Sequence, residues 1–199
     1  MKTLGKEAAL AELAVHRDRL LKTGATCVMC ALAHGGAELP YVAQNEHAVV
    51  LLDRFACRVG HLLIIPKRHV ERLSDLPWEV FVDVQRLAYE AAVAIDASLR
   101  PARVFTATLG AAVDLPMTYA HHHVHVIPVY ETDERARPAR VLSWTEGVIV
   151  YDDAEALELT HSLRASWPRS AFEANARCAQ SGKPGTPSVT DLMTERDVT

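Results

Sequence analysis

The chain has 199 residues, of which 49% are hydrophobic and 23% charged, and its formal net charge is −4. This length allows one domain with a sizeable core, whereas two full domains would be cramped. The composition is that of a globular protein, and the lack of a basic excess argues against a nucleic-acid polymer as the main partner. A small anionic ligand needs only local positive charge and is not excluded.

Targeting and membrane signals are the next feature to consider. The N-terminal stretch MKTLGKEAALAELAVHRDRLL mixes charged residues into its apolar positions, unlike a secretory signal. Apolar runs elsewhere fall short of the roughly eighteen residues of a membrane span. The cysteines do not suggest a disulfide framework in a chain of this size. They are Cys27, Cys30, Cys57 and Cys178. We therefore expect a cytoplasmic protein with reduced thiols and no membrane partner.

The first part of the chain is predicted to form a helix followed by an antiparallel meander. Residues 5–22 place leucines among alanines and charges, and Gly24 marks the predicted end of this helix. Three short apolar runs separated by turn-like residues then predict strands. These runs are YVAQ (41–44), HAVVLLD (47–53) and HLLIIP (61–66).

The second part is predicted to add a long helix, further strands and a last helix. Residues 75–99 place their apolar side chains on one stripe, as an amphipathic helix requires. Asp152 and Glu155 have the spacing of a capping box at the start of the last helix. The predicted strands are 104–110, 121–128 and 147–151.

The order of these elements predicts an α+β domain, because strands, a long helix and strands again do not form a βαβ array. We expect an N-terminal helical extension over residues 1–24 and one domain over residues 25–168. The polar composition of residues 169–199 favours a flexible C-terminal tail.

The stretch AHHHVHVIP, residues 120–128, contains four histidines in five positions. On a strand, alternate side chains share a face, so His121, His123 and His125 would stand about 6.6 Å apart in one row. Imidazole can act as nucleophile, acid or metal ligand near neutral pH. We therefore favour a row that divides labour around one phosphorus centre over an incidental polar strand or a metal site alone.

The stretch also resembles the motif of the histidine triad (HIT) superfamily, His-φ-His-φ-His-φ-φ with φ apolar. Residues 45–76, NEHAVVLLDRFACRVGHLLIIPKRHVERLSDL, are similar to the superfamily's other signature block, in which LD, GH and IPKxH follow in that order. The resemblance covers roughly residues 27–167. It implies a HIT-like fold, an antiparallel sheet with a long helix packed on it, to which this chain adds an N-terminal and a C-terminal helix.

The resemblance implies a nucleotide hydrolase. His123 would attack the α-phosphate of a nucleotide and form a nucleotidyl-histidine, which water would hydrolyse to a nucleoside monophosphate such as AMP. His125 would hydrogen-bond phosphate oxygens, and Thr118 would contact the leaving group. Asp53 would bind the ribose hydroxyls, although by residue type alone it could equally be a turn former. His61 would lie near the nucleotide.

The implied substrate is a nucleoside phosphoramidate or a dinucleoside polyphosphate, and a homodimer is expected. Two alternatives stay open: a nucleotidyltransferase of the same superfamily, and a zinc-stabilised nucleotide-binding protein with vestigial activity. The chain departs from the Hint-like branch before the triad, where Met117 replaces the amide of Gly-Gln-Ser and Gly110 stands near an Asn position. In addition, His122 occupies an apolar position of the motif.

Cys27-Val-Met-Cys30 forms a CxxC pair. Alone, it could be a redox pair or two buried cysteines. Two thiolates and two imidazoles would instead complete a tetrahedral structural zinc site. Many HIT proteins have such a site, and the resemblance implies Cys27, Cys30, His69 and His121 as its ligands. Zinc would then couple the N-terminal segment to the catalytic strand.

Overall fold

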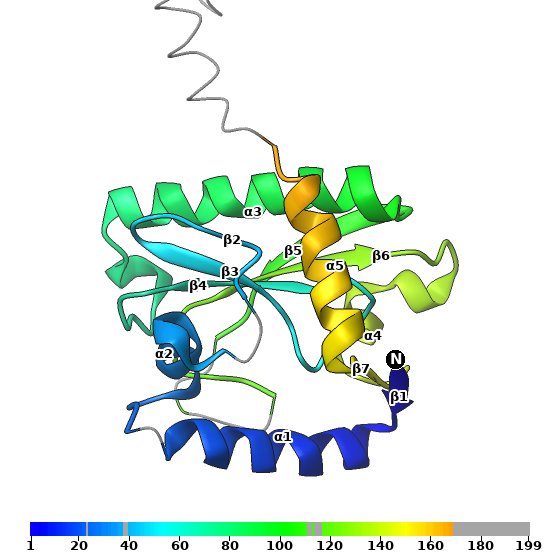
Figure 1. The fold of residues 1–199 in the computed structure, drawn as a ribbon, viewed down its shortest axis with the longest axis horizontal. Coiled ribbons are helices and arrows are strands. Elements are labelled where there is room, and N and C mark those ends of the chain that lie inside the picture. Colours follow the sequence, from blue (N-terminus) through cyan, green and yellow to red (C-terminus); the bar gives the residue numbers. More distant parts are fainter. Residues whose placement is uncertain (23, 38–39, 111–112, 114–116, 169–199) are drawn as a thin grey trace, which may run out of the picture. The chain divides into compact units, whose positions relative to one another are not determined.

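A five-stranded antiparallel sheet with the strand order β2-β3-β4-β6-β5 lies at the centre of the fold (Figure 1). The computed structural model describes residues 1–22, 24–37, 40–110, 113 and 117–168. In the order of the sheet, the strands are β2 (Ala43–Gln44), β3 (Ala48–Leu52), β4 (Leu62–Pro66), β6 (Val124–Val129) and β5 (Arg103–Thr108).

One face of the sheet is covered by α3 (Trp78–Leu99) and α5 (Asp153–Ala165). Val84 and Ile95 of α3 pack with Val50, Ile64 and Val126 of the sheet in the largest cluster of buried residues. The apolar stripe of α3 therefore forms the main core, as its helical spacing predicts. The start of α5 is fixed by the predicted capping box.

The opposite face of the sheet is covered by α2 (Val28–Ala31) and the irregular turn η1 (Leu32–Gly36). Val49, Leu51 and Ile65 pack there against Met29 and Ala33. Every residue of β3 and β4 is buried, because both faces of these two strands are covered. Burial on both faces explains why their sequences are continuous apolar runs rather than alternating ones.

The N-terminal segment forms a further layer with residues that follow β6. In β1 (Lys2–Leu4), Leu4 pairs with Val148 of β7 (Val148–Val150). Ala9 of α1 (Lys6–Leu21) is buried in a separate cluster. This cluster also contains Val141 of α4 (Pro138–Leu142) and Trp144, which follows that helix. Figure 1 shows α1 and α3 on opposite sides of the sheet. The remaining turns are η2 (Leu73–Asp75) and η3 (Glu134–Ala136).

The predicted α+β class, N-terminal helix, meander, long helix and last helix are confirmed. One boundary was wrong: the strand predicted over 121–128 begins at Val124, so the first triad residues precede it. The His122 backbone N–H donates to the Val70 carbonyl, away from the ladder. The tail predicted for residues 169–199 lies outside the described residues. In the described part, no helix is both long and apolar enough to cross a membrane.

Candidate active site and metal centre

His123 is fixed in one orientation by its own backbone. Its Nδ1 lies 2.7 Å from the carbonyl oxygen of His121, which can only accept a hydrogen bond. The proton of a neutral His123 therefore resides on Nδ1, and the Nε2 lone pair is left for another partner. Burial lowers the pKa of His123, which keeps the ring neutral near neutral pH. The arrangement is that of a nucleophilic imidazole.

His125, two residues along, belongs to a second group of side chains. Its ring centroid is 4.8 Å from that of His123. Its Nδ1 lies 3.0 Å from Nε2 of His61, whose Nδ1 lies 3.1 Å from Oδ2 of Asp53. Burial lowers the pKa of His61 to about 3 and that of His125 to about 2. Burial also raises the pKa of Asp53 to about 6.

These four side chains line one cavity of about 120 Å³. Apolar residues of α2, β3 and β4 enclose one part of it, among them Met29, Leu51 and Leu63. Phe55 and Trp144 line another part, with ring centroids 6.3 Å apart and an interplanar angle of 26°. Leu13 and His16 bring the N-terminal helix to the same cavity, which no sequence pattern indicated.

Thr118 lies in the segment that leads to the triad. Its side-chain oxygen is buried and has no hydrogen-bond partner among the described residues. Its neighbours Met117 and Tyr119 line the cavity, and Met117 has a positive φ of 70°. A buried hydroxyl without a protein partner is a group that a ligand can satisfy. The Nε2 atom of His122 is likewise buried without a partner in the described part of the chain.

Cys27, Cys30, His69 and His121 form a separate cluster, in which the potential ligand atoms all lie within 4.8 Å of one another. The Nδ1 atom of His121 is 3.3 Å from the Cys27 sulfur and 3.2 Å from Nδ1 of His69. The Cys30 sulfur is 3.3 Å from Nδ1 of His69. Tetrahedral zinc at ordinary bond lengths holds such atoms about 3.3–3.6 Å apart. The four residues therefore fit a zinc ion.

The contacts around this cluster also orient its ligand atoms. Nε2 of His121 lies 3.1 Å from the Pro66 carbonyl, and Nε2 of His69 lies 3.8 Å from a Glu71 carboxylate oxygen. The Pro66 carbonyl can only accept a hydrogen bond from Nε2 of His121, so Nδ1 of that ring is left to face the Cys27 sulfur. Burial raises the pKa of Cys27 to about 12, and a coordinated cation would reverse this by deprotonating the thiol. A redox pair would not explain two imidazoles aimed at its sulfurs.

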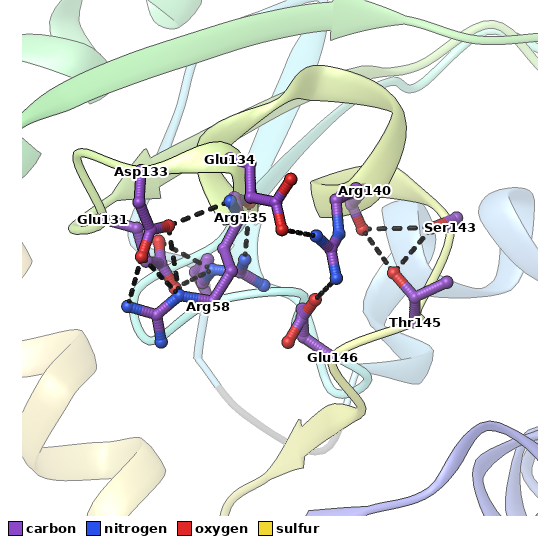
Figure 2. Close-up of polar contacts among 9 residues, drawn as sticks. All are labelled: Arg58, Glu131, Asp133, Glu134, Arg135, Arg140, Ser143, Thr145 and Glu146. Carbon is purple, nitrogen blue, oxygen red and sulfur yellow. Dashed lines mark hydrogen bonds and ion pairs between the residues drawn. The ribbon is translucent and has the colours of Figure 1, made fainter.

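The loop that joins β3 to β4 carries both Asp53 and His61, and residues after β6 hold it in place. The Arg58 side chain, which is buried, has Nε 2.9 Å from Oε1 of Glu131 (Figure 2). Arg58 also donates to the carbonyls of Cys57 and Arg135, at 2.8 and 3.4 Å. This partly buried ion pair was missed by sequence reasoning, because its partners are 73 positions apart.

Two tyrosines complete the attachment of this loop. The Tyr130 hydroxyl donates to the Val59 carbonyl at 2.8 Å, and the Gly60 N–H donates to the Tyr151 hydroxyl at 3.0 Å. Three successive loop residues, Arg58 to Gly60, are thereby bonded to the segment that follows β6. The position of His61 depends on contacts made by residues 130–151.

Comparison with known proteins agrees with this geometry. The HIT domain family matches residues 34–132. A 16.1 kDa HIT-like protein from Mycoplasma pneumoniae is 36% identical over 107 residues, which are 53% of this chain and 73% of that protein. The chain therefore belongs to the HIT family, whose members generally process nucleotides.

Solved structures show the same fold. A zinc-bound histidine triad family protein from Mycobacterium smegmatis is 26% identical, with a TM-score of 0.53, over 76% of this chain and 97% of that one. A hypothetical histidine triad nucleotide-binding protein from Sulfolobus tokodaii is 20% identical, with a TM-score of 0.55, over 80% of this chain and 100% of that one. The predicted HIT-like fold is confirmed.

Proposed function

We propose that this protein is a nucleotide hydrolase in which Nε2 of His123 attacks the α-phosphate of a bound nucleotide. The observation that carries the proposal is the 2.7 Å contact between His123 Nδ1 and the His121 carbonyl, beside a cavity that His125 also lines. This contact leaves the attacking nitrogen unprotonated and aimed by the backbone.

In the first step, a bond forms between His123 Nε2 and phosphorus while the bond to the leaving group breaks. His125 would donate from Nε2 to a phosphate oxygen, because its Nδ1 is occupied by His61. The hydroxyl of Thr118 would bond the leaving group. Asp53 would bind the ribose hydroxyls. Water then attacks phosphorus, the P–N bond breaks, and a nucleoside monophosphate is released.

Zinc at Cys27, Cys30, His69 and His121 has a structural part in this proposal. When bound, it neutralises the two thiolates and links α2 to the segment that precedes β6. His121 holds zinc through its side chain and orients His123 through its carbonyl. A cytoplasmic location belongs to the proposal, because a reducing compartment keeps both cysteines able to bind metal.

A homodimer is also proposed. Strand β5 is an edge of the sheet, and an edge strand offers unpaired backbone groups to a second copy. Trp78 and Tyr89 of α3 are 74% and 69% exposed and offer apolar surface to a partner. Light scattering on the protein as it elutes from a size-exclusion column measures the mass of the assembly directly. A monomeric mass at micromolar concentration would reject the dimer.

The hydrolase is tested by release of monophosphate from adenosine phosphoramidate and from diadenosine polyphosphates. Wild type is compared with His123→Ala and with His161→Ala, a matched loss of one exposed histidine on α5. We expect turnover that only His123→Ala abolishes, with the better substrate identifying the class. Turnover that requires an added acceptor phosphate would indicate a nucleotidyltransferase. Nucleotide binding without any turnover would indicate a binding protein.

A further inference from the structure

His61 contacts two neighbours with different ring nitrogens. Nδ1 lies 3.1 Å from Asp53 Oδ2, and Nε2 lies 3.0 Å from His125 Nδ1. All three side chains line the cavity of the proposed nucleophile. The His61 ring is 1% exposed and the Asp53 side chain 16% exposed, so little water competes with these two contacts.

A third contact fixes where the protons of this group lie. The backbone N–H of Cys57 donates to Nδ1 of His61 at 3.3 Å, and a backbone N–H can only be a donor. Nδ1 of His61 is therefore the unprotonated nitrogen, and Nε2 carries the proton that is donated to His125 Nδ1. An ionised Asp53 would face a lone pair across 3.1 Å, whereas a protonated Asp53 donates to it. Burial acts in the same direction, since it raises the pKa of Asp53.

We propose that one proton moves along this chain from Asp53 to His125 when an anionic phosphoryl group binds beside His125. Asp53 Oδ2 gives its proton to Nδ1 of His61, and Nε2 of His61 gives its proton to Nδ1 of His125. Each bond to hydrogen that breaks is matched by one that forms. His125 becomes an imidazolium that keeps its Nε2–H for the phosphate, and Asp53 becomes a carboxylate.

The inference rests on the proposed hydrolase and gives Asp53 a role beyond ribose binding. Asp53 and His61 are positioning residues in this scheme, because they act on substrate through His125. The charge of the group is unchanged in total, but a positive charge is placed next to the phosphate. Because burial lowers the pKa of His125 to about 2 in the resting protein, the imidazolium forms only against the negative charge of the bound phosphoryl group, an attraction that the low-dielectric cavity strengthens.

Other titratable groups near the chain do not replace Asp53 as the proton source. Burial raises the pKa of Cys57 to about 12 and also raises that of Tyr151, so both keep their protons near neutral pH. His123 uses its Nδ1 proton for the His121 carbonyl. The groups facing Asp53, His61 and His125 are His16, Arg54, Cys57, Arg58, His123 and Tyr151.

The test is Asp53→Asn, because an asparagine amide donates to Nδ1 of His61 as a protonated acid does but gives up no proton. In wild type, kcat/KM should fall as pH rises above about 6, because Asp53 of the enzyme without substrate then loses its proton. In Asp53→Asn, this limb should be absent and kcat should be lower by about 10–100-fold. A variant with the wild-type pH profile would overturn the proposal.

Substrates that lack the 2′ and 3′ hydroxyls distinguish a role of Asp53 in ribose binding from its role in the proton chain. If Asp53 acts through His61, Asp53→Asn loses the same factor on the ribose and the dideoxy substrate. A loss that disappears on the dideoxy substrate would assign Asp53 to the ribose alone and overturn the proposal.

A measurement that needs no turnover tests the proton chain separately from the proposed hydrolase activity. Nitrogen NMR of the resting zinc-loaded protein should show His61 and His125 both protonated on Nε2 and unprotonated on Nδ1. A His61 protonated on Nδ1 would overturn the proton chain even in an active enzyme. A second zinc per chain that His61→Asn removes would also overturn it, because the group would then be a metal site.

Discussion

His121 serves two groups at once: its backbone carbonyl accepts the hydrogen bond of His123 Nδ1, while its own Nδ1 faces the Cys27 sulfur at 3.3 Å. The proposed nucleophile and the candidate metal cluster are therefore joined through a single residue. A shift of His121 would change both the direction of the His123 ring and the nitrogen that carries its proton.

Loss of the metal should therefore reduce activity even though no metal ligand touches the proposed substrate. We expect Cys30→Ser to bind zinc about 10–100-fold more weakly and to lose activity in parallel. Cys57→Ser is the matched control for metal content, since Cys57 lies outside the cluster. Zinc released on unfolding and monophosphate release are measured on the same samples. A zinc-free Cys30→Ser with full activity would contradict the coupling.

The partly buried ion pair between Arg58 and Glu131 should stabilise the loop that carries His61. Arg58→Met leaves Glu131 without its cation and should lower the free energy of unfolding by about 2–4 kcal/mol. The double variant Arg58→Met, Glu131→Met should recover part of this loss, because no unpaired charge remains. Urea denaturation of both single variants and the double variant completes the cycle. Additive losses would argue against the pair.

Gly60 tests the same loop without removing a charge. Its φ is +87°, and an added Cβ would overlap the Leu99 side chain. Gly60→Ala should lower the free energy of unfolding by about 1–3 kcal/mol, from backbone strain and from the displacement of the terminal methyl of Leu99. Gly24→Ala is the matched control, since Gly24 has the same φ of +87° with no atom within 4 Å. There only the backbone strain of about 1 kcal/mol applies. Thermal or urea denaturation should separate the two variants, and equal losses would contradict the contact with Leu99.

Asp53 should lower the stability of the folded protein as pH rises from 3.8 to about 6. Its pKa rises from 3.8 to about 6 on folding, so its favourable contribution is complete below pH 3.8 and is lost as pH rises through 6. Between pH 5 and pH 8 this loss amounts to about 1–1.5 kcal/mol. Asp53→Asn does not ionise and should gain that amount over wild type across the same interval. Unfolding free energies at both pH values decide the point, and parallel pH dependences would reject it.

Local sequence patterns predicted the elements whose signals lie within a short, continuous stretch of the chain. The stripe of α3 and the capping box of α5 are examples, because each is encoded within a few turns of one helix. The period-two spacing correctly grouped His123 with His125. It misplaced His121, whose backbone bends away before β6 begins at Val124. That bend is set by the distant partners of His121 at α2 and Pro66, and no local pattern records it.

The features that could not be predicted from the sequence depend on long-range contacts. The pairing of β1 with β7 joins Leu4 to Val148, and a three-residue strand carries too little alternation to be recognised. Asp53 and His61 were both predicted as site residues from the resemblance, but their mutual contact depends on the loop that Arg58 anchors. The proposed metal ligands Cys27, Cys30, His69 and His121 came from the resemblance to the HIT family, because the CxxC spacing alone also allowed a redox pair or two buried cysteines.

Leu13 and His16 of α1 reach the cavity, yet they lie before residues 34–132, the stretch that matches the family. The histidines of the proposed reaction and part of the cavity wall therefore lie in separate segments of the chain. Mutations in α1 can alter which molecules are accepted while the reaction centre stays intact. Sequence divergence in α1 can therefore change substrate preference while the reaction mechanism is kept.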